Sequence, residues 1–218
     1  LSGTRVIARP SALERHARVV QQAAPAAVPT GSARRYGPFI AVDAGEPSPG
    51  EVVRAFDPVL RRQVWIDIAD ASKPPVDDTR RDLSRSARLH WLAGRRSADD
   101  NWDAYEAPDG AAWTTAIADA DWSQVKLPLL DLANELAHSA EDGTRPPLAL
   151  DRVWMRDNGR VILLDFPPPD APARTTADLM PGQLLQAATS RVPRHPSRPA
   201  AFLLSGRGFF ERWSVPPL

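Results

Sequence analysis

The sequence predicts an α+β domain in which an antiparallel sheet comes first and helices follow. Three observations indicate this class. Short β-prone segments separated by turn-forming residues occupy residues 36–106, a pattern typical of an antiparallel meander. Apolar residues at three- and four-residue spacing between 129 and 139 predict a buried helix. The apolar runs Val153–Met155 and Val161–Leu164 flank Asn158-Gly159, which predicts a tight β-hairpin.

The amino-acid composition limits the possible functions and cellular compartments of the protein. The 218 residues have room for one two-lobed domain or two small ones. Because 27 basic residues balance 27 acidic ones, a general nucleic-acid or membrane-surface role is not expected. No apolar run approaches the roughly 18 residues of a membrane span, and we identify no signal peptide. The absence of cysteine excludes disulfides and thiolate metal sites and favours a cytoplasmic location, and the four histidines lack metal-ligand spacing.

Residues 1–35 are expected to form an N-terminal extension or linker that contains a strand and a helix. Residues 4–8 are β-prone, and Ser11-Ala12-Leu13-Glu14 is a capping box that predicts a helix to about Gln22. Residues 24–35 are rich in Ala, Pro and small polar residues, which is typical of a linker. This part is either the tail of a preceding module or an integral extension.

The following sheet is expected to have five antiparallel strands. A polar, Arg-rich stretch from 77 to 88 predicts a short helix between the third strand and the fourth. The predicted strands are 39–42, 51–56, 62–68, 89–93 and 102–106.

The second half is expected to be mainly helical. Pro128 suits the first turn of a helix over about residues 129–139. The second strand of the hairpin is apolar throughout, so we expect it to be buried on both faces, and it ends at Asp165. Further helices are predicted at 181–190 and from about 200 to 213. The C-terminal end is Arg-rich, and it forms either a solvated face or a partner-binding surface.

The order of these elements resembles the bacterial (eukaryotic-like) Ser/Thr protein kinase family. Residues 55–60, Ala-Phe-Asp-Pro-Val-Leu, followed by Val64-Trp65-Ile66, are similar to the second and third strands of those kinases. Asp165-Phe166 is similar to the start of the D-F-G magnesium motif. The resemblance covers about residues 36–166.

The resemblance implies a protein-kinase-like two-lobed fold. Residues 36–110 would form the N-lobe, with its five-stranded antiparallel sheet, and the hinge. Residues 111–218 would form a shortened, mainly helical C-lobe, because the chain after Asp165 is short and contains no A-P-E motif.

Positions that contact phosphate in the family have changed. The glycine-rich loop corresponds to residues 45–50, where Gly45 and Gly50 remain but Pro47 removes an amide donor; the other interpretation is an ordinary hairpin loop. Asp67 stands at the position of the phosphate-binding lysine.

The partners of that lysine and the adenine contacts differ too. Lys73 is expected to be solvated rather than to replace the lysine. The helix at 77–88 contains no Glu, and Asp82 is its nearest acidic candidate. At the passage from strand to hinge, Pro108 lies two residues after Glu106 and cannot donate the backbone N–H that binds adenine in the family.

The catalytic loop is altered as well. Pro147 stands at the position of the catalytic base, and Arg152 stands at that of the magnesium-binding Asn. Asp151 could serve only through a one-residue slip. Asp165 is then a lone carboxylate, and we expect it to be held by backbone amides or by an arginine such as Arg152.

These changes imply a pseudokinase, a non-catalytic kinase-like domain that acts as a regulatory or protein-interaction module. No cofactor is expected, a protein partner is expected, and the domain could belong to a larger membrane-anchored protein. Trp65 and Trp154 are large enough to close the cleft between the lobes. The vestigial nucleotide cleft would comprise Gly45, Gly50, Glu106, Pro108 and Asp165.

Two alternatives stay open. The first is a degenerate Ser/Thr protein kinase that still binds ATP, with magnesium at Asp165 and weak or atypical phosphotransfer. The second is an α+β binding domain unrelated to kinases.

Overall fold

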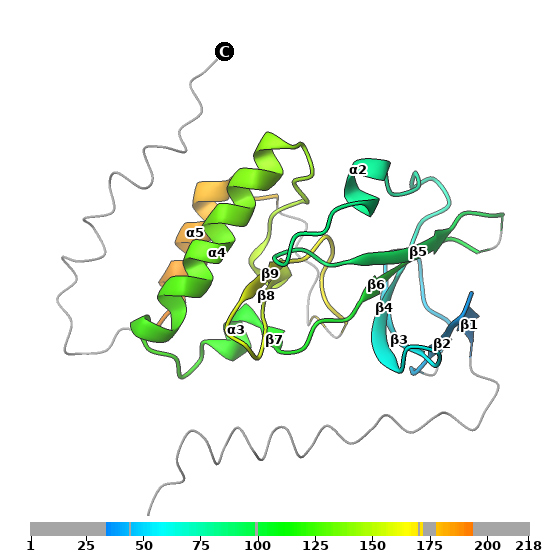
Figure 1. Ribbon diagram of the computed structural model, residues 1–218, viewed down its shortest axis with the longest axis horizontal. Coiled ribbons are helices and arrows are strands. Elements are labelled where there is room, and N and C mark those ends of the chain that lie inside the picture. The colour runs from blue at the N-terminus through cyan, green and yellow to red at the C-terminus, as the bar shows by residue number, and fades with distance from the viewer. Residues whose placement is uncertain (1–33, 44, 99, 170, 172–177, 194–218) are drawn as a thin grey trace, which may run out of the picture.

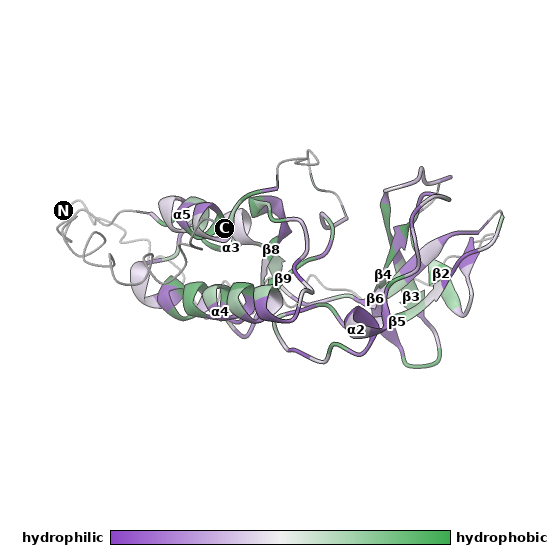
Figure 2. Cartoon of the chain, turned by 90° about the horizontal axis from the view of Figure 1, so that it is seen from above, coloured by the Kyte–Doolittle hydropathy of each residue, from purple (hydrophilic) through white to green (hydrophobic). Residues whose placement is uncertain are grey.

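We describe a computed structural model of the chain, in which residues 34–43, 45–98, 100–169, 171 and 178–193 are described. These residues form a mixed α and β fold, as predicted, with a curled antiparallel sheet at one end and the longer helices at the other (Figure 1). Viewed from above, the molecule is elongated, and the two ends lie far apart (Figure 2). The elements predicted at 4–8, 11–22 and 200–213 fall outside the described residues.

The larger sheet has six strands in the order β1-β2-β3-β4-β6-β5, not the five that were predicted. The additional strand is β1, only two residues long, which pairs Tyr36 with Phe39. The fourth predicted strand, 89–93, lies two residues further along the chain as β5. The strands are β1 (Arg35–Tyr36), β2 (Phe39–Ala41), β3 (Val52–Asp57), β4 (Arg62–Ile68), β5 (Trp91–Arg95) and β6 (Trp102–Glu106).

The alternation of side chains along β4 gives this sheet two different faces. Val64, Ile66 and Ile68 are buried on the outer face, against a core that includes Trp102. Trp65, by contrast, belongs to a cluster that contains residues of the second half of the chain. The inner face therefore joins the two halves of the molecule.

The helix predicted at 77–88 is a single turn, α2 (Asp78–Arg81). Asp77 caps it, since its Oδ1 accepts the backbone N–H of Arg80 at 2.8 Å. The remaining residues of the predicted helix run as a connecting segment, and Arg88 forms an isolated parallel bridge with Leu163.

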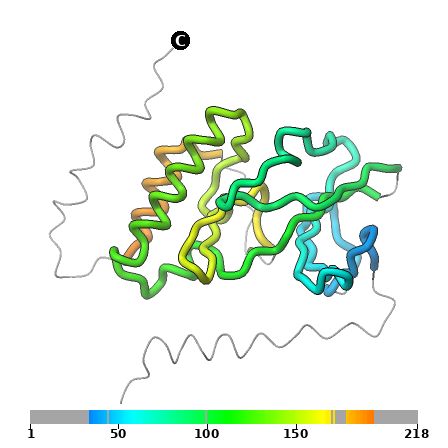
Figure 3. Tube along the Cα trace, in the orientation of Figure 1, coloured from blue at the N-terminus to red at the C-terminus, as the bar shows by residue number. Residues whose placement is uncertain are grey.

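The long helix α4 (Trp122–Glu141) begins seven residues earlier than predicted. Asp121 and Gln124 form a capping box at its start, and Pro128 lies inside the helix instead of in its first turn. The apolar face of α4 packs against α5 (Pro181–Ser190), which was predicted at these residues, and the two helices run side by side (Figures 1 and 3). None of the helices in the described part of the chain combines the length and the apolarity that crossing a bilayer requires.

The predicted hairpin is present as β8 (Val153–Met155) and β9 (Val161–Leu163), and β9 is fully buried as expected. Gly159 makes the turn at φ +78°. A short strand that was not predicted, β7 (Ala111–Ala112), adds to β8 and leads into α3 (Trp113–Ala116). The second half is therefore less purely helical than predicted.

Replacing Gly110 by alanine tests the close backbone contact between the start of β7 and the end of β8. Gly110 has φ +100°, and a Cβ there would overlap the carbonyl oxygen of Met155 and lie 2.7 Å from Arg156 Cα. Gly143, with φ +74° and open space around its Cβ, is the matched control. We expect Gly143→Ala to lower the unfolding free energy by about 1–2 kcal/mol and Gly110→Ala by more than about 4 kcal/mol, both measured by urea denaturation. Equal losses would contradict this geometry.

Candidate functional site

The carboxylate of Asp165 lies immediately after β9 and its neighbour Leu164, and two arginines bind it. Arg80 of α2 binds both oxygens, with Nε 3.0 Å from Oδ1 and Nη2 2.6 Å from Oδ2. Arg88 adds Nη2 at 2.5 Å from Oδ1. The expectation that an arginine holds Asp165 is therefore confirmed, but the arginine named as the example, Arg152, instead donates to the carbonyl of Pro147 at 2.8 Å.

The same contacts continue into α4. Arg88, whose side chain is 0% exposed, also lies 3.4 Å from the buried carboxylate of Glu135. Arg85 lies 2.9 Å from Glu135 and 2.6 Å from Asp142 at the C-terminal end of α4. Three guanidinium groups thus alternate with three carboxylates. We call this set the ion-pair chain: Arg80, Asp165, Arg88, Glu135, Arg85 and Asp142.

The pKa values of this chain follow from burial and pairing. Burial alone would raise the pKa of Asp165, but the hydrogen bonds and charges of Arg80 and Arg88 outweigh it and hold that pKa below its ordinary value of 3.8. Burial is the largest single influence on Arg80 and lowers its pKa, but the hydrogen bond to Asp165 and the nearby negative charges together outweigh it, so the pKa of Arg80 is raised. For Glu135 burial prevails over Arg85 and Arg88, so its pKa is raised. Asp165 is therefore a firmly ionised carboxylate.

Aromatic side chains fill the space between the larger sheet and the β8–β9 hairpin. The rings of Trp65 and Trp154 meet edge to face, with centroids 5.2 Å apart. Trp154 Nε1 also donates to the carbonyl of Asp109 at 2.7 Å. Tyr105 and Phe166 form a second edge contact at 5.0 Å. The two tryptophans that we expected to close the cleft are thus in direct contact.

Asp67 lies near the inner face of the sheet and is 4% exposed. Lys73 Nζ lies 2.6 Å from its Oδ2, so the prediction that Lys73 is solvated was only partly right: the side chain is 48% exposed but ion-paired. Opposite Asp67 on β6, Asp103 pairs with Arg96 at 2.5 Å. Arg96 also donates to the carbonyl of Lys73, which holds the intervening loop against the sheet.

The other predicted site residues lie around this centre. Gly45 and Gly50 lie in the loop between β2 and β3, both at positive φ. That loop faces Pro168 and Pro169, shortly after Asp165, across a cavity of about 520 Å³. The remaining residues are Glu106, which ends β6 and pairs with Arg62 at 3.3 Å, Pro108, Pro147, and Asp82, the C-cap of α2.

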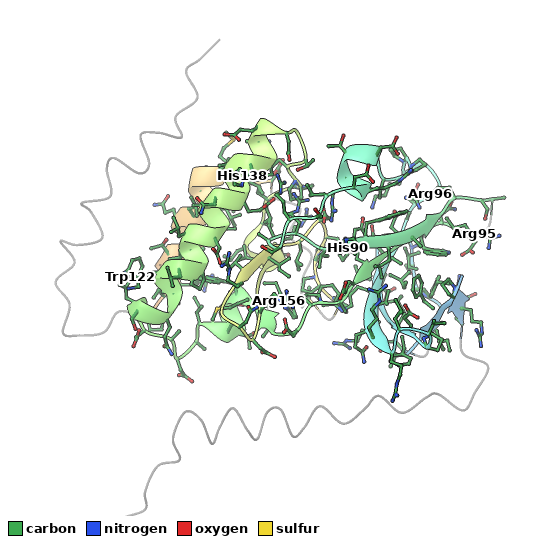
Figure 4. All side chains as sticks on the ribbon, in the orientation of Figure 1. His90, Arg95, Arg96, Trp122, His138 and Arg156 are labelled. Carbon is green, nitrogen blue, oxygen red and sulfur yellow. The ribbon has the colours of Figure 1, made fainter. Side chains whose placement is uncertain are left out.

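Sequence reasoning missed Arg80 and Arg88 as partners of the Asp165 carboxylate, and it missed Glu135 as a second partner of Arg88. Part of this pairing could have been predicted from the sequence. A buried carboxylate needs a cationic partner, and residues 77–88 are rich in arginine and contain no Glu. Of the two histidines in the described part of the chain, His90 immediately precedes β5 and His138 lies on α4 (Figure 4). Within the described residues no group of three or more His, Asp or Glu could hold a metal ion.

Comparisons with known proteins find likeness in structure rather than in sequence. No protein-family model matches the chain, and no curated protein matches it. Among the solved structures that resemble it is one described as "PpkA-294 apo form", which is 17% identical over 81% of this chain and 71% of that chain, with a TM-score of 0.47. A likeness at this level is too distant to carry an argument about activity or partners.

Replacing Asp165 by asparagine should destabilise the protein strongly. The substitution leaves Arg80 and Arg88 buried without this counter-charge, which costs about 3–5 kcal/mol. Asp78→Asn is the control, because it removes the exposed pair with Arg81 and should cost less than about 0.5 kcal/mol. Chemical denaturation measures both, and similar losses in the two variants would rule out the role assigned to Asp165.

The contribution of Asp165 to the free energy of unfolding should also decrease at low pH. Because the folded pKa is lowered, its stabilisation is fully present above the unfolded value of about 3.9 and is lost as pH falls through the folded pKa. The difference in unfolding free energy between the wild type and Asp165→Asn should therefore be constant from about pH 5 to 8 and shrink below about pH 4. A difference that grows on acidification would contradict the lowered pKa.

Proposed function

We propose that the chain is a non-catalytic protein-kinase-like domain that serves as a regulatory or protein-interaction module. The proposal rests on the resemblance of residues 36–166 to bacterial Ser/Thr kinases, taken together with the contacts around Asp165. The observation that carries it is the double guanidinium contact on that carboxylate.

The family's equivalent of Asp165 binds the magnesium ion that accompanies ATP. Here a metal would have to displace Arg80 from both carboxylate oxygens and Arg88 from one of them. Arg152, at the position of the second magnesium ligand, would repel a cation. The residues present therefore do not fit a magnesium ion, and no phosphoryl-transfer step is assigned to them.

The charges at the positions that bind phosphate in the family also argue against nucleotide binding. Asp67 takes the place of the phosphate-binding lysine, and the ammonium group of Lys73 lies against it at 2.6 Å. The short helix that would supply a glutamate supplies Arg80 instead, and this pairs with Asp165. Among the described residues, the ionisable ones that line the 520 Å³ cavity beside Pro168 are Asp43 and Glu51, both acidic, and they would repel a triphosphate there.

In this proposal, side chains of the protein fill the position that adenine occupies in the family. Trp65 stands where V-A-I-K has alanine, and it packs on Trp154. The indole N–H of Trp154 binds the carbonyl of Asp109, next to Pro108, which has no N–H to offer. Side chains would thus take the volume that a purine needs.

A domain arranged in this way can act through its surface. We propose a protein partner, a cytoplasmic setting and membership of a larger, membrane-anchored protein, since the kinase-like domains that the chain resembles are often built so. Regulation would then come from partner binding rather than from turnover.

Thermal unfolding with and without Mg·ATP tests this proposal against the degenerate-kinase alternative. Micromolar binding at millimolar ligand would stabilise the fold by about 4 kcal/mol, or roughly 8–16 °C for a chain of this size. We expect no shift. Trp65→Leu is a second test: it shortens the side chain that fills the adenine position but keeps Asp67 and the paired Asp165, and we expect no shift there either.

A magnesium-dependent shift in the wild type would support the degenerate kinase instead. A shift in Trp65→Leu alone would mean that bulk, not charge, excludes the nucleotide. EDTA in place of magnesium is the control for metal dependence, and an active kinase domain is the positive control.

A further inference from the structure

The turn between β3 and β4 exposes two large apolar side chains in succession. Val59 is 79% exposed and Leu60 is 62% exposed. Pro58, which precedes them, is exposed as well. We call residues 57–62 the hairpin tip. It belongs to the larger sheet and lies far from α4 and α5 (Figure 1).

Hydrogen bonds fix the backbone of the hairpin tip. The carboxylate of Asp57, which is only 5% exposed, accepts the backbone N–H groups of Val59 at 3.0 Å and of Leu60 at 3.1 Å. Arg62 donates to the other oxygen of Asp57 at 3.4 Å and lies 3.3 Å from Glu106 on β6. Because the backbone that carries the two apolar side chains is already ordered, little conformational entropy is lost when a partner covers them.

Arg61, next to the two apolar residues, has a strained backbone. Its φ is +52°, and among the described residues it is the one residue other than glycine with a positive φ. Glycine would relieve this strain, so stability does not account for an arginine here. Its side chain is exposed and has no ion-pair partner within the described part of the chain. A strained residue that places an unpaired cation beside exposed apolar side chains indicates a binding role.

The charge around the hairpin tip suits an anionic partner. Asp57 is buried, and Glu106, which is half exposed, is paired with Arg62. Arg61 is exposed, and so is Arg35 of β1, the strand that precedes the β1–β2 turn of the same sheet. The balanced composition argues against a general membrane-surface role, but it does not report how charge is distributed locally.

We propose that the hairpin tip docks on an anionic lipid surface. Val59 and Leu60 enter the boundary between headgroups and acyl chains, and the guanidinium group of Arg61 meets the lipid phosphates. The inference goes beyond the proposed function and takes one point from it, that the domain belongs to a membrane-anchored protein and so stays close to a bilayer.

A lipid surface fits these observations better than a protein partner does. The apolar side chains lie at a turn rather than in a groove, and the cation lies beside them, which matches a membrane with its hydrocarbon below its phosphates. Two small apolar side chains bury less surface than one myristoyl chain, which by itself gives reversible binding with a constant of about 10⁴ M⁻¹. The contact is therefore weak on its own and serves to orient a domain that is already tethered.

Because the chain contains no cysteine, a fluorescent label can be placed at a single introduced cysteine. We label Val59→Cys with an environment-sensitive dye, and Asn134→Cys, at an exposed position of α4, is the matched control. The probe is millimolar lipid as vesicles of phosphatidylcholine with about one third phosphatidylglycerol. The emission at residue 59 should rise at least about twofold, and that at residue 134 should not change. The rise should disappear with phosphatidylcholine alone and shrink between about 0.05 M and 0.5 M salt.

Two variants of the unlabelled 218-residue chain separate lipid binding from folding, and cosedimentation with the anionic vesicles measures their binding. Leu60→Ser should weaken binding about tenfold and leave the unfolding free energy unchanged, because this side chain is largely exposed. Arg61→Gly should weaken binding about fivefold, the factor for one basic residue at an anionic surface. Its unfolding free energy should stay the same or rise, because glycine accepts the positive φ.

The absence of any binding to the anionic vesicles would overturn the proposal and leave the hairpin tip as a contact for a protein partner. An equal rise at both labels, equal binding to neutral vesicles, or binding that survives both substitutions would overturn it as well. None of these results bears on the Mg·ATP experiment, which contains no lipid.

Discussion

A buried carboxylate cannot stay ionised without partners, and the partners of Asp165 determine how the two halves of this protein meet. Arg80 of α2 pairs with it, and so does Arg88, which lies in the segment after α2. Arg88 also pairs with Glu135 of α4. The short helix, the connecting segment, the end of β9 and the long helix are therefore held by one set of alternating charges. Loss of Asp165 would leave the buried guanidinium groups of Arg80 and Arg88 without this counter-charge.

Apolar packing completes the same junction. Trp65 belongs to the larger sheet and Trp154 to the hairpin, and their contact lies on the inner face that Asp67 borders. Charge pairing and ring packing thus fill the junction between the two halves of the molecule with the protein's own side chains.

The sequence predicted those elements whose signals are local. The hairpin followed from Asn158-Gly159 between apolar runs, and α5 lies at the residues predicted for it. The start of α4 was predicted incorrectly. The helix begins after the capping box at Asp121, and Pro128, which we expected in its first turn, lies inside it. The partners of Asp165 lie 85 and 77 residues away in the chain, a separation that no local pattern reports. Only the need of Asp165 for a cation could be read from the sequence.

The central claim is that Arg80 and Asp165 act as one buried unit. A double-mutant cycle of Arg80→Met and Asp165→Asn, measured as unfolding free energies, tests this most directly. If the two side chains are coupled as the geometry indicates, the double variant should be more stable than the sum of the single effects predicts, by more than about 2 kcal/mol. Additive effects would contradict the account.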